Sequence, residues 1–140
     1  MAHHFEFDSE RRILLVVLEG EVEEGEVSQY HGEARAILRK LNVAYAISDY
    51  SAVSGGEIGG DTVRDLAFRD AFVEGKIPRL IVTPQNYLYG LARMYELSAN
   101  RTPDMLQILR SREQALKAIK VENPRFERLD VKQFLDGEGR

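Results

Sequence analysis

The sequence predicts a single-domain α/β fold with a mixed, mainly parallel sheet of four to five strands and helices packed on it. Two observations support this. The 140 residues suit one compact domain. Short apolar runs rich in β-branched residues alternate with longer segments in which apolar residues recur every three or four positions. Such alternation, in the order β-β-α-β-α-β-α-β-α, implies right-handed crossovers between parallel strands, with the first strand antiparallel at or near an edge.

The chain is expected to open with a hairpin and a helix. Residues 5–8 alternate apolar and polar, and residues 13–18 form an apolar run that Gly20 ends. From 23 to 41 the apolar residues form one helical stripe, and glutamates crowd its first turn, where the helix dipole favours negative charge.

The remaining elements alternate in type. Strands are expected over 43–47, 80–82 and 105–109, and helices over 63–75, 86–99 and 111–119. Residues 51–60 are small and glycine-rich, which predicts a loop. Thr62, Asn86 and Ser111 are residue types that cap helix N-termini. The expected core comprises Ile13, Leu15, Val17, Val43, Ile47, Leu66, Leu80, Val82, Leu91, Ala92 and Ile108.

The composition restricts the partners and the location that we expect for the protein, and the residue pattern sets the expected domain boundaries. Residues 1–122 are expected to form the domain, and residues 123–140 a C-terminal tail that packs on the domain or on a partner subunit. A formal charge of −4 argues against nucleic acid as the main partner. No run approaches the length of a membrane span, and no signal peptide is recognisable, so a cytoplasmic location is expected.

Few side chains suit catalysis. There is no cysteine, no serine in a G-x-S-x-G turn and no H-E-x-x-H pair or other metal-ligand spacing, so we expect neither an enzyme nor a metal or cofactor site. His3 and His4 lie in a terminal segment that we expect to be mobile. Residues 55–62 nearly spell a phosphate-binding loop, but Asp61 replaces its lysine and would repel phosphate.

Polar residues follow the strands at the carboxyl edge of the sheet, where ligands of α/β proteins usually bind. The candidate partner- or ligand-binding residues are Asp49, Ser51, Asp61, Thr62, Asn86 and Arg93. Gly90 falls in mid-helix, which predicts a close approach to another element. Arg93 is expected to pair within the chain rather than with a partner subunit.

Residues 85–96 are the most specific stretch, and with the preceding residues 80–84 they resemble a segment common in small bacterial STAS-like proteins. These proteins look like distant relatives of the anti-sigma-factor antagonists, and some are described as STAS/SEC14-like. Residues 46–53 resemble the strand and turn "D-x-S-x-V" of STAS domains. The resemblance covers most of the chain up to Asn123.

The resemblance implies a non-enzymatic role in protein interaction or regulation. In the antagonists, phosphorylation of a serine or threonine at the start of the second helix is the switch. Thr62, after Asp61, is the nearest equivalent and so a candidate phosphosite. A protein partner is expected, and a homodimer is considered. The alternative function is a small-ligand sensor that binds an anion, nucleotide or lipid head group at the carboxyl edge of the sheet.

Overall fold

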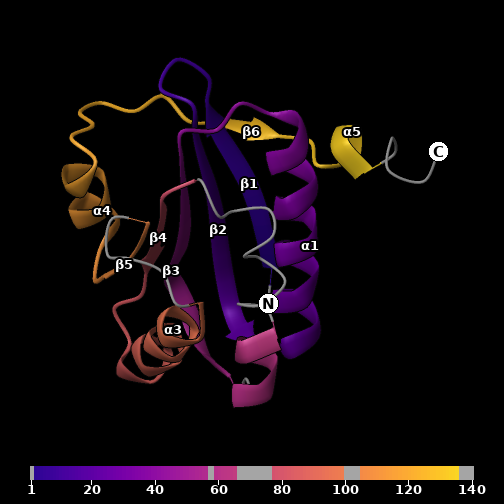
Figure 1. The fold of residues 1–140 in the computed structure, drawn as a ribbon, viewed down its shortest axis with the longest axis vertical. Helices are drawn as coiled ribbons and strands as arrows, with labels where there is room; N and C mark the ends of the chain where they lie inside the picture. The colour runs from indigo at the N-terminus through magenta and orange to yellow at the C-terminus, as the bar shows by residue number, and fades with distance from the viewer. Residues whose placement is uncertain (1, 57–58, 66–76, 100–104, 136–140) are drawn as a thin grey trace.

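A six-stranded mixed sheet forms the centre of the computed structural model, which describes residues 2–56, 59–65, 77–99 and 105–135 (Figure 1). The strand order is β5-β4-β3-β2-β1-β6. The strands are β1 (Ala2–Asp8), β2 (Ile13–Val22), β3 (Tyr45–Gly56), β4 (Arg79–Val82), β5 (Leu106–Leu109) and β6 (Glu127–Leu129). The helices are α1 (Glu24–Lys40), α3 (Asn86–Ala99), α4 (Arg112–Ala118) and α5 (Lys132–Leu135), and residues 60–65 are also helical.

Strands β2, β3, β4 and β5 run parallel, whereas β1 is antiparallel to both of its neighbours. The expectation of four to five strands with the first at or near an edge is therefore wrong in its count, because β6 covers the outer side of β1. Strand β6 and helix α5 also lengthen the predicted element order. Strand β6 has only three residues, two of them charged, so the sequence carries no periodic signal for it.

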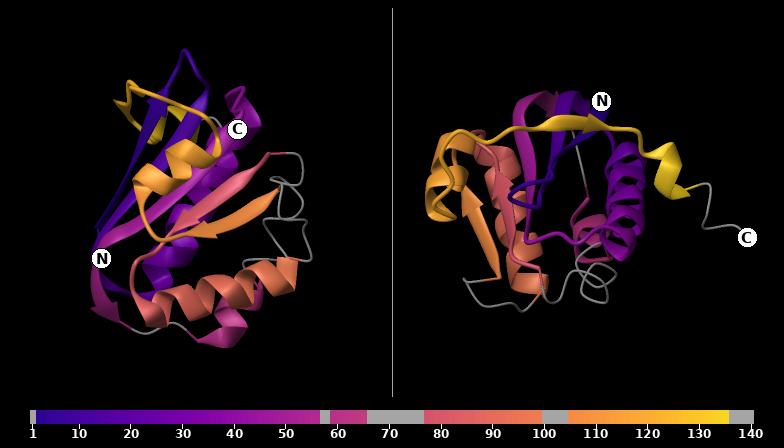
Figure 2. Two further views of the ribbon diagram at one scale, coloured as in Figure 1. Left: turned by 90° about the vertical axis from the view of Figure 1, so that its left-hand side faces the viewer. Right: turned by 90° about the horizontal axis from the view of Figure 1, so that it is seen from above.

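Helices cover both faces of the sheet (Figure 2). On one face, alternate residues of β2 such as Leu14 and Val16 pack with α1, α3 and the 60–65 helix. On the other face, Ile13 and Leu15 pack with Ala115 of α4. Alternation along a strand sends successive side chains into different layers, so a continuous apolar run is what a strand buried on both sides requires.

The second and third strands are longer than predicted. Strand β2 continues past Gly20 to Val22, and β3 continues to Gly56 through much of the predicted loop. These extensions pair with each other, with register shifts on either side of Gly20. Gly20 has a φ of 83°, which glycine adopts without steric cost. The backbone hydrogen bonds between β2 and β3 thus keep residues 51–56 in a strand, although the propensity of these residues favours a loop.

The other elements lie close to their predicted positions. Helix α3 begins and ends where the sequence indicates, and α1, β4, β5 and α4 differ by one or two residues at their ends. Beyond residue 65, the predicted second helix lies outside the described residues, as does Leu66. Of the other ten predicted core residues, seven are buried, and Val17, Leu91 and Ile108 are half-buried.

Candidate functional site

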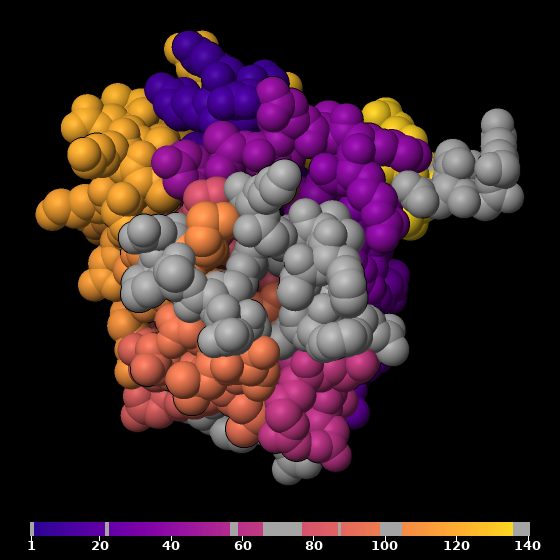
Figure 3. Space-filling model, in the orientation of Figure 1, coloured from indigo at the N-terminus to yellow at the C-terminus, as the bar shows by residue number. Residues whose placement is uncertain are grey.

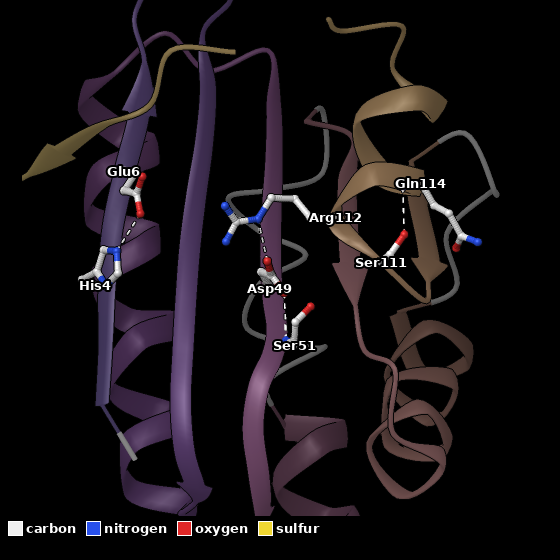
Figure 4. Close-up of polar contacts among 7 residues, drawn as sticks. All are labelled: His4, Glu6, Asp49, Ser51, Ser111, Arg112 and Gln114. Atoms are coloured by element: carbon white, nitrogen blue, oxygen red, sulfur yellow. Dashed lines mark hydrogen bonds and ion pairs between the residues drawn. The ribbon is translucent and has the colours of Figure 1, made fainter. Parts of the chain in front are cut away.

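Asp49 is a buried carboxylate on β3, on the face of the sheet that α4 covers (Figure 4). Its Oδ2 accepts from Nε of Arg112, the first residue of α4, at 2.7 Å. Its Oδ1 accepts from the backbone N–H of Ser51 at 2.8 Å. The Asp49 side chain is 4% exposed and that of Arg112 is 39% exposed. The Asp49–Arg112 pair therefore fixes the start of α4 over the sheet. The hydrogen bond from Ser51 brings the two candidates Asp49 and Ser51 together.

Asp61 and Thr62 lie in the 60–65 helix on the opposite face. The N–H of Val63 donates to the carbonyl of Gly59 at 3.2 Å, so the helix starts at Gly59 and not at Thr62. The expected capping role of Thr62 is therefore wrong, and this residue is half-buried in the first turn. The Asp61 side chain is 97% exposed and forms an ion pair with Arg64.

The helix begins before Thr62 because residues 59 and 60 are glycines, which fit close to the neighbouring helices. A Cβ on Gly60 would lie 3.2 Å from Sδ of Met94 in α3, which is closer than ordinary contact. The N–H of Gly59 donates to Oε1 of Glu24, at the start of α1. The 60–65 helix is thus held between α1 and α3.

Asn86 is the first residue of α3, and Gln85 precedes the helix because its carbonyl accepts from the N–H of Tyr89 at 2.8 Å. The expectation that Asn86 caps the helix is therefore wrong. Its Oδ1 instead accepts from Nη1 of Arg110 at 3.3 Å. The Arg110 guanidinium also lies 3.8 Å from the ring centre of Tyr89, a cation–π contact that joins the segment after β5 to α3.

Gly90 and Arg93 lie on the exposed side of α3. No atom of the described residues lies within 4 Å of the position that a Gly90 Cβ would take, so the expected close approach is wrong. Arg93 forms an ion pair with Glu96 of the same helix. The six candidates therefore occupy both faces of the sheet. Asp49 and Ser51 lie on the α4 side, Asp61, Thr62 and Arg93 lie on the other, and Asn86 lies at the carboxyl edge.

Sequence reasoning missed a polar layer under α1 and α3. Arg79 of β4 is buried, and its guanidinium donates to the hydroxyl of Tyr95 at 2.5 Å and to Oγ of Ser48 at 3.1 Å. The hydroxyls of Tyr30 and Tyr50 also bond to each other. The sequence signal for this layer is an arginine directly before the apolar run Leu80–Val82. It does not indicate which side chains the arginine contacts.

Tyr50 is half-buried as a residue, but its hydroxyl lies inside the protein. Burial, followed by the neighbouring Tyr30 hydroxyl, raises the pKa of Tyr50 well above the usual phenol range. The nearby Arg79 charge opposes this rise without cancelling it. Tyr50 therefore stays protonated at neutral pH and can act as a hydrogen-bond donor.

The histidines are also placed differently from the expectation. His3 and His4 lie in β1, so the expected mobile segment is part of the sheet. His3 contacts two α1 carboxylates, with Nε2 2.7 Å from Oε1 of Glu33 and Nδ1 paired with Glu26. His4 pairs with Glu6 at 2.6 Å (Figure 4). Among the described residues, no group of three possible ligands could hold a metal ion.

Ser111 caps α4 as predicted, because its Oγ accepts from the N–H of Gln114 at 3.1 Å (Figure 4). The glutamine Oε1 accepts from the N–H of Arg110 at 3.0 Å rather than from Ser111 itself. A serine followed three residues later by a glutamine is the sequence pattern of a capping box, and the serine half of that pattern forms here. Within the described part of the chain, no helix is long and apolar enough to cross a membrane.

Comparison with known proteins supports one fold. No protein-family model matches the sequence, and no curated protein does. Among solved structures, the chain is similar to the anti-sigma factor antagonist SpoIIAA in its unphosphorylated form. The match covers 86% of this chain and 100% of that chain, with a TM-score of 0.58 and 14% sequence identity. The chain therefore has a STAS-like fold.

Proposed function

We propose that this protein is a non-enzymatic regulatory module that acts by binding another protein. The observation that carries the proposal is the likeness of its fold to SpoIIAA, a protein named as an anti-sigma factor antagonist. The net charge of −4 favours a protein over nucleic acid as the partner. We also propose that the protein acts in the cytoplasm.

The proposed working surface consists of the 60–65 helix and the adjacent exposed side of α3, which lie side by side at the bottom of Figure 3. Leu97 of α3 is 74% exposed, which is unusual for a large apolar side chain. Arg93 and Asp61 present charges on the same two helices. An apolar side chain with charged neighbours is the composition of a protein interface with a polar rim.

Thr62 completes this surface as a candidate phosphosite. It lies in the first turn of the 60–65 helix, where the helix dipole favours added negative charge. A phosphate there would also lie beside Asp61, so it would make this surface more negatively charged. Phosphorylation would then control the affinity for the partner.

The test uses a photo-crosslinking amino acid placed in the full-length protein in its native cells. Positions 61 and 97 probe the proposed surface, and position 117, on α4 across the sheet, is the matched control. We expect one partner to crosslink from 61 and 97 and not from 117. With that partner purified, Leu97→Asp should weaken binding at least about tenfold, as loss of an interface anchor does. Lys117→Glu should leave the affinity unchanged.

Two outcomes would contradict the proposal. One is a partner that crosslinks from position 117 alone, and the other is unchanged affinity in Leu97→Asp. For the phosphosite, Thr62→Glu should alter the measured affinity more than Thr62→Val does. Equal effects would remove Thr62 from the proposal.

The alternative function, a small-ligand sensor at the carboxyl edge, is favoured by one observation. The Arg110 guanidinium lies at the start of α3, next to Asn86, and places a positive charge beside a helix N-terminus. Native mass spectrometry of freshly purified protein tests it. A co-purified anion that is lost in Arg110→Gln would support the sensor, and bare protein would favour the interaction module.

A further inference from the structure

Met94 of α3 places its sulfur at the junction between α3 and the 60–65 helix, which lie side by side in Figure 3. Nη1 of Arg64 lies 4.0 Å from Sδ of Met94, close enough to donate a weak hydrogen bond to the thioether. Gly60 is also next to the sulfur, because a Cβ at that position would lie 3.2 Å from it. The sulfur therefore lies between the two helices that form the proposed working surface.

This junction is open to solvent. Met94 is half-buried, and the Arg64 side chain that contacts its sulfur is 55% exposed. Hydrogen peroxide is a small oxidant that converts a methionine thioether to the sulfoxide, and cells reverse this step with methionine sulfoxide reductases. The sulfur of Met94 is therefore within reach of an oxidant in the folded protein.

The structure also supplies a partner for the oxidised side chain. A sulfoxide is polar, so it normally destabilises the packing around a methionine. The 4.0 Å between Sδ and Nη1 exceeds a charge-assisted N–H···O bond of about 2.7–2.9 Å, and one bent sulfur–oxygen bond accounts for the difference. An oxygen added on the Arg64 side thus receives a hydrogen bond from a cation. Nη2 of Arg64 pairs with Asp61, so one guanidinium can hold both oxygens.

We propose that Met94 is a reversible oxidation site and that Arg64 holds its sulfoxide. A sulfur lone pair attacks one oxygen of hydrogen peroxide, and the O–O bond breaks. The departing hydroxide takes the proton of the new S–OH group and leaves as water. Sulfur thereby loses two electrons, and the peroxide gains them. A reductase dithiol returns the two electrons, becomes a disulfide and releases the oxygen as water.

Oxidation changes the proposed working surface in two ways. It adds a polar oxygen at the junction of the two helices, and it fixes the Arg64 side chain beside α3. The effect on a partner rests on the proposed function, whereas the oxidation of Met94 does not.

The test begins with the full chain, folded and treated with dilute hydrogen peroxide, followed by tryptic peptide mapping. Met94 falls in the peptide of residues 94–101 and Met105 in that of residues 102–110, so mass spectrometry separates them. Met105 is the matched control, because it is also half-buried and no described hydrogen bond reaches its sulfur. We expect Met94 to be converted to the sulfoxide, and methionine sulfoxide reductases to restore it in the folded chain.

The role of Arg64 is measured in two backgrounds. Met105→Leu keeps Met94 as the internal methionine, and Met94→Leu keeps Met105. In Met105→Leu, oxidation should change the equilibrium constant of unfolding by less than about threefold, because the bond from Arg64 offsets the cost of the polar oxygen. With Arg64→Leu added, oxidation should raise that constant at least about tenfold, because the charge-assisted bond is then missing. In Met94→Leu, the substitution Arg64→Leu should not alter the effect of oxidation.

Three results would overturn the proposal. They are a Met94 that stays reduced in the folded chain while Met105 is oxidised, a sulfoxide that the reductases do not reduce, and an effect of oxidation that Arg64→Leu leaves unchanged. None of these measurements involves a partner, so their failure is distinguishable from failure of the crosslinking test. With the crosslinked partner in hand, equal affinities of oxidised and reduced Met105→Leu would overturn the effect on binding alone.

Discussion

The backbone N–H of Arg125 donates to Oδ2 of Asp8 at 2.9 Å, joining residues that are 117 positions apart. The other oxygen of Asp8 accepts from the N–H of Arg11 at 2.9 Å, and the Arg11 guanidinium lies 3.2 Å from Oδ2. One fully buried carboxylate therefore closes the β1–β2 turn and anchors the segment that leads into β6.

Asp8 should make stability depend on pH. Burial alone would raise its pKa, but the hydrogen bonds from Arg11 and Arg125 outweigh burial and lower it. Its contribution is therefore present above its unfolded pKa of about 3.9 and is lost as the pH falls through the lowered folded value. Asp8→Asn should reduce the free energy of unfolding at pH 7 by about 1–3 kcal/mol.

Urea unfolding at pH 7 and at lower pH checks this, and the gap between Asp8→Asn and wild type should shrink in acid. Asp130→Asn is the matched control, because Asp130 is exposed and its carboxylate accepts, among the described hydrogen bonds, only from the nearby N–H of Lys132. A gap that stays constant with pH would show that the Asp8 charge does not contribute.

Ser111 and Thr62 should differ in their effect on stability. Ser111→Ala removes an observed side-chain cap and should cost about 1 kcal/mol. Thr62→Ala changes a residue inside a helix that starts at Gly59, so it should cost less than about 0.5 kcal/mol. Chemical denaturation of both variants measures the difference. A larger loss in Thr62→Ala would restore the capping role that the sequence suggested.

Gly90→Ala should stabilise the protein. Position 90 is exposed in mid-helix with open space around it, so alanine should add about 0.5–1 kcal/mol through helix propensity. Gly60→Ala should gain less, because its new methyl group would press on Sδ of Met94. Thermal unfolding compares them. Destabilisation by Gly90→Ala would mean that this side of α3 packs against another molecule.

Leu15→Ala tests the layer under α4. Leu15 is fully buried in that layer, so its truncation should cost about 2–5 kcal/mol. Val17 is on the same strand and the same face but is only half-buried, and Val17→Ala should cost clearly less. Equal losses in guanidinium unfolding would contradict the burial pattern of β2.

Some elements follow from the sequence because local patterns encode burial. The three- and four-residue spacing from Val27 to Leu38 predicts α1, and every residue of that stripe is buried. The apolar run of β2 likewise predicts a strand, and Ser111 with Gln114 predicts the start of α4. In each case the residues that decide the structure are neighbours in the chain.

Other features depend on partners distant in sequence, and only the tertiary structure decides them. Strand β6 forms because it pairs with β1, and because Asp8 binds the backbone of Arg125 in the segment that leads into β6. Residues 51–56 are a strand because the end of β2 pairs with them. Arg79 is buried because Tyr95 and Ser48, from two other elements, receive its hydrogen bonds. Local propensity differs between such alternatives by only about 1 kcal/mol, which a few long-range contacts exceed.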